Sequence, residues 1–370
     1  MKTDTVIVGA GVIGLAIARE IAKEGHEVVV LEKNHRAGEE TSTRNSGVIH
    51  SGIYYPSGSN KALLCVEGNR LLYEYARERN IGYRNTGKLV VANSSEEVER
   101  LEQLQVQGKE NGVEGLELLS KKEVESIQPE INAELALLSP SSGIIDAADL
   151  ILSLEADLQQ KGVILSCNAQ VENISQGNSG FSVQVNAEQN YSVEADTVIN
   201  CAGLHAVDVA KKIEGLDKDL IPTAYYGKGH YFQLSGKHPF KEYLVYPLHN
   251  KDSLGVHVSI DVGGKARFGP DLTWTENLDY SFDESLKEKY VQSIKTYWPY
   301  LNPDKLSPDY TGIRPKIYGP QEEPADFLIQ TATEHNIEGL INLLGIESPG
   351  LTSSLSLAKK VSSLLFMARI

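Results

Sequence analysis

The segment 4–33 constrains the fold of this chain more than any other part of the sequence. It reads DTVIVGAGVIGLAIAREIAKEGHEVVVLEK, with an apolar, β-rich run at residues 5–8 and a second one at 28–31 that ends at Glu32. Between the two runs lies a helical stretch that opens on the spacing G-x-G-x-x-G, formed by Gly9, Gly11 and Gly14. Strand, glycines, helix, strand and acid in this order predict a βαβ unit that binds an adenine dinucleotide.

Each position of this unit has a physical reason. Gly9 permits the tight turn from strand to helix, and Gly11 lets backbone N–H groups approach a pyrophosphate. Gly14 lets the helix pack closely on the strand, and the helix N-terminus presents unpaired donors and its positive dipole end to phosphate. Glu32 can accept hydrogen bonds from a ribose diol.

The βαβ unit alone leaves both FAD and NAD open. Two later segments read as further strand–turn elements: ADTVINCAGLHA at 195–206 and GLINLLGIESPGLTSSLSLAKKVSSLL at 339–365. A cofactor that contacts strand–turn elements from both ends and from the middle of the chain must be large, and FAD fits this better than NAD does. The sequence therefore favours FAD.

Five further segments carry a family resemblance: RNSGVIHSGIYYPSGSNKALLCVEG (44–68), RNTGKLVVA (84–92), SSGIIDAADL (141–150), LGVHVSIDVGG (254–264) and SPGLTSS (348–354). They resemble the flavoprotein family of D-amino acid oxidase, glycine oxidase and glycerol-3-phosphate oxidase. Within that family the resemblance is strongest to the L-2-hydroxyglutarate dehydrogenases and oxidases, and it covers nearly the whole chain. It implies an α/β fold with a glutathione-reductase-type FAD-binding Rossmann domain, interleaved with an α+β substrate domain whose sheet is mainly antiparallel.

The chain of 370 residues exceeds the size at which one core usually suffices, so two domains are expected. We found no internal repeat or low-complexity linker, which is why the domains are expected to interleave. The expected FAD-binding parts are 1–84, 141–216 and 309–370, and the expected substrate-domain parts are 85–140 and 217–308. Periodicity predicts helices at 61–79, 94–108, 120–128, 146–160 and 284–297, and strands at 88–92, 163–167, 171–174, 181–185, 192–193, 197–201, 231–234, 243–247, 255–261 and 265–268.

Composition narrows the class of protein. The net charge is −15, from 35 basic and 50 acidic residues, which argues against nucleic acid or an anionic membrane as the main partner. The three cysteines, Cys65, Cys167 and Cys201, are odd in number and not spaced as metal ligands, so we expect no metal site and reduced thiols in a cytoplasmic enzyme. Because the first strand is expected directly after the first residues, we expect no signal peptide. The apolar runs are shorter than a membrane span requires, so we expect none, while peripheral membrane contact stays open.

A flavin-dependent oxidation of an alcohol needs a base for the hydroxyl proton, and a neutral imidazole suits this task. His50 lies in NSGVIHSG, and the matching histidine is the proposed base in the glycerol-3-phosphate oxidase branch, so the resemblance implies that role here. Hydrogen bonding or covalent attachment to the flavin is the alternative. His257, in the expected strand 255–261, is predicted to point away from its apolar neighbours, either toward substrate or toward solvent. His230 is expected to be structural or at the entrance, and the other histidines, His249 among them, remain unassigned.

The carboxylate of a hydroxy acid calls for a fixed cation. Arg314, confined between Gly312 and Pro315, matches the arginine that anchors the substrate in the family, although a domain-bridging ion pair would also explain it. The distal carboxylate of a diacid would need Lys316, Lys228 or Arg44. The expected substrate-binding residues are Ser51, Tyr54, Tyr246, His257, Arg314 and Ser348, where Ser348 could instead cap the last helix.

The cofactor contacts expected from the βαβ unit and from the resemblance lie at seven places along the chain. Backbone N–H groups before the last helix are expected to meet the N1–C2 edge of the flavin, where negative charge collects on reduction. The expected positions are Gly9, Gly11, Val12, Ile13, Gly14, Glu32, Lys33, Thr41, Arg44, Asn45, Ser46, Gly47, Val171, Ala202, Gly203, Arg314, Gly345, Ser348, Gly350, Leu351 and Thr352.

The resemblance implies an enzyme that oxidises a 2-hydroxy acid to a 2-oxo acid by hydride transfer to flavin N5, with L-2-hydroxyglutarate as the expected substrate and oxygen or a quinone-type molecule as the electron acceptor. Two substrate-domain segments depart from that branch, YYGKGHYF (225–232) and RFGPDLTW (267–274), which leaves the substrate more open than the reaction class. Oxidation of glycerol 3-phosphate or of an amino acid is the alternative within the family. A flavin-binding electron-transfer or regulatory protein is the alternative outside it.

Overall fold

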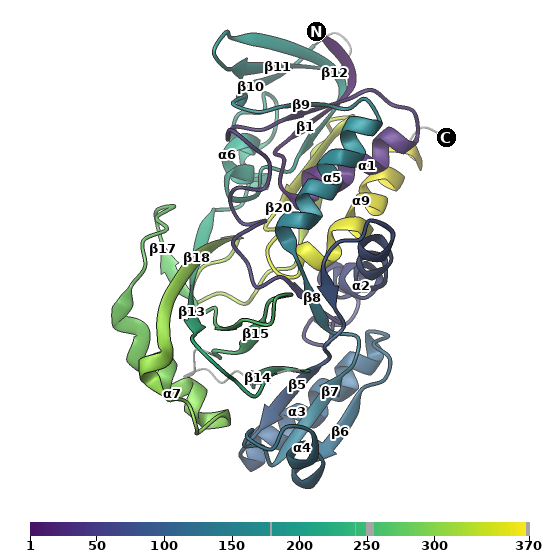
Figure 1. The fold of residues 1–370 in the computed structure, drawn as a ribbon. Helices are drawn as coiled ribbons and strands as arrows, with labels where there is room; N and C mark the ends of the chain where they lie inside the picture. The colour runs from purple at the N-terminus through teal and green to yellow at the C-terminus, as the bar shows by residue number, and fades with distance from the viewer. Residues whose placement is uncertain (178–179, 241, 249–254, 368–370) are drawn as a thin grey trace. The chain divides into compact units, whose positions relative to one another are not determined.

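The structure is a computed structural model that describes residues 1–177, 180–240, 242–248 and 255–367. The chain divides into two compact units, each assembled from separate stretches of sequence (Figure 1). Unit 1 comprises Met1–Thr43, Ala147–Tyr226 and Ile313–Ile370, and unit 2 comprises Arg44–Asp146 and Gly227–Gly312. His249 and Leu254, which belong to segments considered above, lie outside the described residues.

Unit 1 is built on a sheet with the strand order β10-β11-β12-β1-β2-β9, in which β20 lies beside β12 and β19 beside β20. The pairs β12–β1, β1–β2, β2–β9 and β12–β20 are parallel, whereas β10–β11, β11–β12 and β19–β20 are antiparallel. The bounds are β1 (Lys2–Val8), β2 (Val28–Leu31), β9 (Ile164–Ser166), β10 (Gln170–Gln176), β11 (Phe181–Asn186), β12 (Tyr191–Asn200), β19 (Leu328–Gln330) and β20 (Leu340–Leu344). Every residue of β2 is buried, as expected for a parallel strand covered on both faces.

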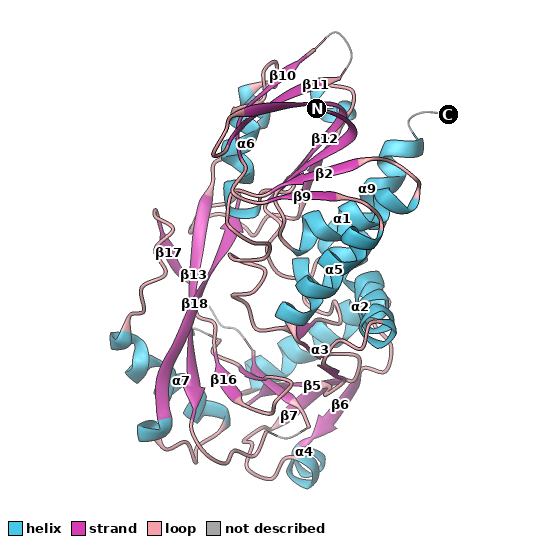
Figure 2. Cartoon of the chain, turned by 45° about the horizontal axis from the view of Figure 1, so that its top comes forward, coloured by secondary structure: helices cyan, strands magenta, loops and turns pink. Residues whose placement is uncertain are grey.

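The helices of unit 1 cover this sheet (Figures 1 and 2). Helix α1 packs against α5 and α9 on one side, and α6 contacts β12 and β20. Gly14, Ala16 and Ala18 are buried on α1, and small side chains such as these let neighbouring elements approach closely. The bounds are α1 (Val12–Lys23), α5 (Ala147–Gln160), α6 (Ala206–Lys211), α8 (Ala332–His335) and α9 (Gly350–Met367).

Unit 2 contains a sheet with the order β17-β13-β16-β15-β14-β5-β7-β6, with β18 beside β13, and a small sheet with the order β3-β8-β4. The pairs β13–β16, β16–β15, β15–β14, β5–β7, β7–β6, β3–β8 and β8–β4 are antiparallel, whereas β14–β5 is parallel. The strands are β3 (Val48–Ile49), β4 (Tyr83–Arg84), β5 (Lys88–Ala92), β6 (Glu117–Ser120), β7 (Leu135–Ser139), β8 (Gly143–Ile145), β13 (Tyr225–Leu234), β14 (Leu244–Pro247), β15 (Val258–Ile260), β16 (Ala266–Phe268), β17 (Thr273–Thr275) and β18 (Leu306–Lys316). The helices are α2 (Asn60–Glu78), α3 (Ser95–Glu110), α4 (Lys121–Ile127) and α7 (Lys287–Tyr297).

The architecture confirms the predicted fold class. One unit contains a largely parallel nucleotide-binding sheet and the other a mainly antiparallel sheet, and the sequence stretches of the two units alternate along the chain. Several details differ from the sequence-based expectations, among them the grouping of 141–146 and 309–312 with unit 2 and of 217–226 with unit 1. Residues 44–84 group with unit 2 rather than with the nucleotide-binding unit, because β3 and β4 both pair with β8. The strands expected at 192–193 and 197–201 form one strand, β12, and the strand expected at 255–261 is confined to Val258–Ile260, so His257 precedes it.

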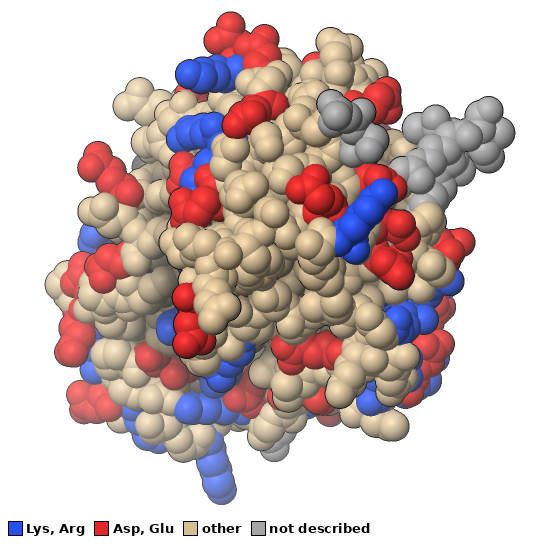
Figure 3. Space-filling model, turned by 90° about the horizontal axis from the view of Figure 1, so that it is seen from above, with Lys and Arg blue, Asp and Glu red and all other residues tan. Residues whose placement is uncertain are grey.

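The surface carries charges of both signs. On the face shown in Figure 3, the side chains of Lys and Arg are interspersed with those of Asp and Glu. Among the helices of the described residues, none combines the length and the apolar character that crossing a bilayer would require.

Candidate active site

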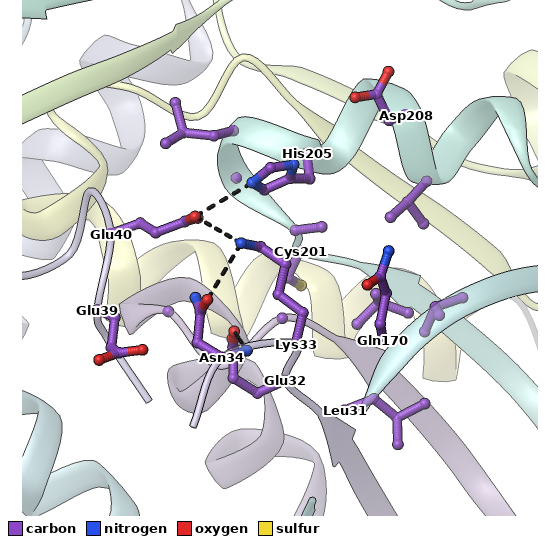
Figure 4. Close-up of a pocket in the computed structure, with 18 of the residues that line it drawn as sticks. Leu31, Glu32, Lys33, Asn34, Glu39, Glu40, Gln170, Cys201, His205 and Asp208 are labelled. Atoms are coloured by element: carbon purple, nitrogen blue, oxygen red, sulfur yellow. Dashed lines mark hydrogen bonds and ion pairs between the residues drawn. The ribbon is translucent and has the colours of Figure 1, made fainter. Parts of the chain in front are cut away.

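Unit 1 holds a cavity of about 530 Å³ at the carboxyl ends of β1, β2 and β12 (Figure 4). This is the edge of a parallel sheet at which nucleotides bind in doubly wound folds. Eight of the predicted cofactor positions line it: Gly9, Gly11, Glu32, Lys33, Thr41, Val171, Ala202 and Gly203. The lining also includes residues that the sequence did not single out: Asn34, Glu40, Ser42 and His205.

The glycines of the first turn lie where a side chain would collide with backbone. Gly9 has φ +101°, and a Cβ there would lie 2.7 Å from the carbonyl oxygen of Cys201. A Cβ on Gly14 would lie 2.0 Å from the carbonyl oxygen of Gly9. The turn and the close packing of α1 on β1 therefore both depend on glycine. Val12 and Ile13, also predicted cofactor positions, form the first turn of α1 beside them, and Ser42 Oγ accepts a hydrogen bond from the Val12 N–H at 2.9 Å.

Glu32 follows β2 directly and is 7% exposed at the cavity wall. Its two carboxylate oxygens accept hydrogen bonds from the backbone N–H groups of Ala10 and Asn34, both at 2.8 Å. These bonds hold the carboxylate in one orientation and leave each oxygen a further lone pair for a ligand hydroxyl. The residue thus has the position and the acceptor capacity that a ribose diol requires.

Replacing Glu32 with Gln is expected to weaken FAD binding roughly 10- to 100-fold, because a charged acceptor for the diol is lost and an amide NH₂ meets backbone donors. Titration of the apoprotein with FAD, followed by quenching of flavin fluorescence, measures the effect. Asp208 lines the same cavity but is exposed and paired with Lys211, so Asp208→Asn is the matched control and should change the affinity little. Equal affinities for wild type and Glu32→Gln would rule out a role in ribose binding.

A three-residue network borders the same cavity. Glu40 Oε1 accepts a hydrogen bond from Lys33 Nζ at 2.8 Å and lies 3.3 Å from His205 Nε2 (Figure 4). Burial raises the pKa of Glu40, but the hydrogen bonds from His205 and Lys33 outweigh this, so the pKa is lowered overall. The carboxylate is therefore ionised at neutral pH and holds the side chains of Lys33 and His205 at the cavity wall. His205 was left unassigned from the sequence because its loop carries no local pattern.

The turn from β20 to α9 gathers five predicted cofactor positions: Gly345, Ser348, Gly350, Leu351 and Thr352. Gly345 has φ +67°, and a Cβ there would lie 2.8 Å from Ile317. Gly350 opens α9, and a Cβ there would lie 4.0 Å from the side chain of Ile13 in α1, so this turn lies near the N-terminus of α1 within unit 1. These five residues are not among those that line the described cavity.

Arg314 and the two lysines considered for the distal carboxylate of the substrate have different surroundings. Arg314 lies half-buried near the end of β18. Lys316 forms an ion pair with Glu347 at 2.7 Å, in which both side chains are less than a tenth exposed. Lys228 pairs with Asp279 at 3.3 Å. The charges of both lysines are thus already matched within the protein.

The stretch Arg44–Gly47, predicted to contact the cofactor, lies in unit 2. The guanidinium of Arg44 lies 4.6 Å from the centre of the Tyr280 ring. Asn45 Oδ1 accepts a hydrogen bond from the Gly47 N–H at 2.8 Å, and the hydroxyls of Ser46 and Tyr231 lie 3.0 Å apart. This stretch is therefore tied to its own unit by local turns and by hydrogen bonds to distant strands.

His50 follows β3 in unit 2 and is held through its backbone. Its carbonyl oxygen accepts a hydrogen bond from Asn69 Nδ2 at 2.8 Å, and the Cys65 thiol lies at 3.6 Å. Burial and, to a smaller extent, the charge of Lys88 hold the pKa of His50 well below its usual value. The imidazole is therefore neutral at physiological pH, as a general base must be. The neighbouring Ser51 is buried and accepts a hydrogen bond from Ser139 Oγ at 2.8 Å.

The other predicted substrate-binding residues of unit 2 cluster around one lysine. The rings of Tyr246 and His257 stack with centres 3.8 Å apart. Lys88 Nζ lies 4.1 Å from the centre of the Tyr246 ring and 5.5 Å from that of Tyr54. Because His257 precedes β15, the alternation argument for its direction does not apply, and the stacking on Tyr246 determines its position instead. Lys88 itself was not predicted as a site residue.

Two other histidines are structural. His230 is 1% exposed, and its Nδ1 lies 2.9 Å from Asp271 Oδ1, which also accepts a hydrogen bond from the His230 N–H. His335, which the sequence leaves unassigned, is 6% exposed and its ring accepts a hydrogen bond from the Ile337 N–H. Both therefore serve packing and hydrogen bonding inside their units.

Residues 4–364 match the family model described as FAD dependent oxidoreductase. The chain is 40% identical to the mitochondrial L-2-hydroxyglutarate dehydrogenase of Arabidopsis thaliana, over 98% of this chain and 83% of that protein. It is 30% identical to a glycerol 3-phosphate dehydrogenase of Caloramator mitchellensis, over 98% of this chain and 73% of that protein.

Among solved structures, the reduced L-α-glycerophosphate oxidase of Mycoplasma pneumoniae with FAD bound is similar to this chain, with a TM-score of 0.88 and 27% identity over 99% of this chain and 95% of that one. The nucleotide cradle of unit 1 accommodates this cofactor, since Gly9 and Gly11 line the cavity without side chains and Glu32 presents the acceptors that a dinucleotide needs. The cofactor is FAD, and the chain belongs to the family of FAD-dependent oxidoreductases.

Proposed function

We propose that this protein oxidises L-2-hydroxyglutarate to 2-oxoglutarate. The observation that carries the proposal is the 40% identity to an L-2-hydroxyglutarate dehydrogenase over nearly the whole chain. The neutral imidazole of His50 and the two tyrosines beside Lys88 support it, because they are the groups that a hydroxy acid would need. The electron acceptor in this proposal is oxygen or a quinone-type molecule. The three free thiols fit the reducing cytoplasm as its location.

In the proposed reaction, bound FAD supplies the acceptor for the two electrons that leave C2 of the substrate together with its hydrogen. His50 takes the proton of the hydroxyl group, so the C2–O single bond becomes a double bond as the C2–H bond breaks. The buried position of His50 favours this role, because burial keeps the imidazole unprotonated before the reaction. Arg314 binds the carboxylate next to C2 through two parallel N–H donors.

The proposal is tested by mixing the purified holoprotein, without air, with L-2-hydroxyglutarate, D-2-hydroxyglutarate, glycerol 3-phosphate and a set of amino acids. We expect bleaching of the flavin band with L-2-hydroxyglutarate and slow or no bleaching with the others. Preferential bleaching by glycerol 3-phosphate would support the second candidate, which the similarity to a glycerol 3-phosphate dehydrogenase favours. No bleaching with any compound would point to an electron-transfer or regulatory flavoprotein and would refute the proposal.

Replacing Arg314 with Met is expected to raise the KM for L-2-hydroxyglutarate by about 100-fold and to change kcat much less, because a bidentate charged contact that acts in both ground and transition states is lost. Steady-state kinetics over a wide substrate range separate the two parameters. Arg36 in the same unit is exposed and pairs only with Glu39 in the described contacts, so Arg36→Met is a suitable control. An unchanged KM in Arg314→Met would exclude it as the anchor.

A further inference from the structure

Lys88 occupies an unusual position for a lysine. It opens β5, which lies between β14 and β7, and it pairs with Leu244 on one side and Ser139 on the other. Its side chain is fully buried, with 0% exposure. Lysines are almost never buried to this extent without a partner for the ammonium group, because desolvation of a charge is costly.

The ammonium group of Lys88 lacks such a partner inside the protein. Among the described residues, Nζ makes no hydrogen bond. Its neighbours are the rings of Tyr246 and Tyr54, which attract a cation but do not accept its three N–H bonds. The hydroxyl of Tyr246 is also buried and has no hydrogen-bond partner in the described part of the chain. Within the described part of the chain, the ammonium group and the hydroxyl of the neighbouring tyrosine thus each lack an acceptor.

The cations considered earlier for a second carboxylate are differently placed. Lys316 is matched by Glu347 and Lys228 by Asp279. The guanidinium of Arg44 lies over the ring of Tyr280. Arg267, which was not among these cations, is matched by Asp261 and Asp309 at 3.0 and 2.5 Å. Among the described residues no acceptor contacts Lys88 Nζ, which leaves its ammonium group available to a ligand. The neighbouring Tyr54, His50 and His257 are only partly buried.

We propose that Lys88 binds the distal carboxylate of a dicarboxylic 2-hydroxy acid and thereby selects diacids over monoacids. The carboxylate accepts a charge-assisted hydrogen bond from Nζ and a second one from the Tyr246 hydroxyl, which satisfies both buried donors at once. This inference rests on the proposed oxidation of L-2-hydroxyglutarate. It deepens that proposal by naming the residue that distinguishes the five-carbon diacid from its monoacid analogues.

The protonation behaviour of the cluster supports this role. Burial lowers the pKa of Lys88 to about 7, while the nearby Cys65 thiol opposes this shift weakly. Burial raises the pKa values of Cys65, Tyr54 and Tyr246, and it lowers that of His50, so these four groups are uncharged at neutral pH. His257 faces the cluster through its stacking on Tyr246. Above pH 7 the free protein loses the charge of Lys88, so binding of a diacid must take up a proton and weakens as the pH rises.

The test compares wild-type holoenzyme with Lys88→Met, which keeps the length and removes the charge, and with Lys88→Arg, which keeps a charge that does not titrate. The substrates are L-2-hydroxyglutarate and L-2-hydroxyvalerate, which has the same chain length but lacks the distal carboxylate. In Lys88→Met we expect kcat/KM to fall at least 100-fold for the diacid and less than 3-fold for the monoacid. Equal losses for both substrates would overturn the assignment of Lys88 while leaving the proposed function intact.

Two further measurements test the assignment of Lys88, and the first of them needs no turnover. Glutarate cannot be oxidised at C2, and its binding, followed by the shift of the flavin absorbance, should be at least 30-fold tighter than that of valerate in wild type and equal to it in Lys88→Met. In wild type the KM for the diacid should rise up to about tenfold per pH unit above pH 7, a rise that Lys88→Arg should abolish. If glutarate binding depends on Lys88 but no hydroxy acid reduces the flavin, the carboxylate site stands and the proposed oxidation fails. If glutarate and valerate bind wild type equally, Lys88 is not a carboxylate site.

Discussion

Replacing His50 with Asn is expected to leave FAD bound and to slow its reduction by L-2-hydroxyglutarate by about 10²- to 10⁴-fold, the range over which a general base acts. Asn preserves the size and polarity of the side chain but cannot take up the hydroxyl proton. Stopped-flow absorbance under anaerobic conditions measures the reduction rate directly, without interference from the electron acceptor. The carbonyl of residue 50 still accepts the hydrogen bond from Asn69, so the loop should keep its shape.

The pH dependence sharpens this expectation. Burial and the charge of Lys88 lower the pKa of His50, so the imidazole stays neutral as the pH falls from 8 to 6 and the reduction rate should not drop in this range on its account. An unperturbed histidine would instead lose activity through its usual pKa near 6.5. His35 is largely exposed in unit 1, so His35→Asn provides a control that should reduce at the wild-type rate. A wild-type rate in His50→Asn would require another base.

Replacing Gly14 with Val is expected to yield protein without its yellow colour and with an FAD affinity lowered by more than 100-fold. Even the Cβ would lie 2.0 Å from the Gly9 carbonyl oxygen, so α1 must move away from β1 and carry its N-terminal donors with it. The same displacement disturbs the buried contact of α1 with α9, and overpacking of this kind typically costs about 1–3 kcal/mol of stability.

Absorbance of the purified protein and FAD titration of the apo form test this variant, and thermal unfolding reports its stability. Gly82→Ala is the matched control, because its Cβ would meet its nearest neighbours at 3.8 Å, an ordinary contact distance. We expect the control to retain FAD at wild-type affinity. If Gly14→Val retained FAD as well, the close approach of helix and strand would not be needed for the cofactor.

Much of unit 1 could be predicted from local sequence. The βαβ unit is encoded in residues 4–33, since the strands, the glycine turn and the helix involve only neighbours along the chain. The predicted pocket residues Gly9, Gly11 and Glu32 accordingly line the cavity. The strand–turn segments at 195–206 and 339–365 favoured FAD over NAD. The resemblance supported FAD and added the fold class, because segments along nearly the whole chain match the family.

Tertiary pairing decided what the local pattern could not. Residues 44–84 belong to unit 2 because β3 and β4 pair with β8, and this depends on a strand far away in the sequence. Glu40 and His205 meet across the cavity only because β12 lies next to β1, which brings the two loops together.

Lys88 shows most clearly the difference between what local sequence predicts and what tertiary contacts decide. In the sequence it is one lysine at the start of a short apolar strand, and nothing in KLVVA distinguishes it from a solvent-exposed residue. Its burial and its lack of a counter-charge follow from β14, β7 and the tyrosines packed around it. Local order along the chain thus determined the nucleotide-binding unit, whereas the charge state and environment of the side chains were decided by contacts between distant segments, because the cost of burying a charge depends on everything that surrounds it.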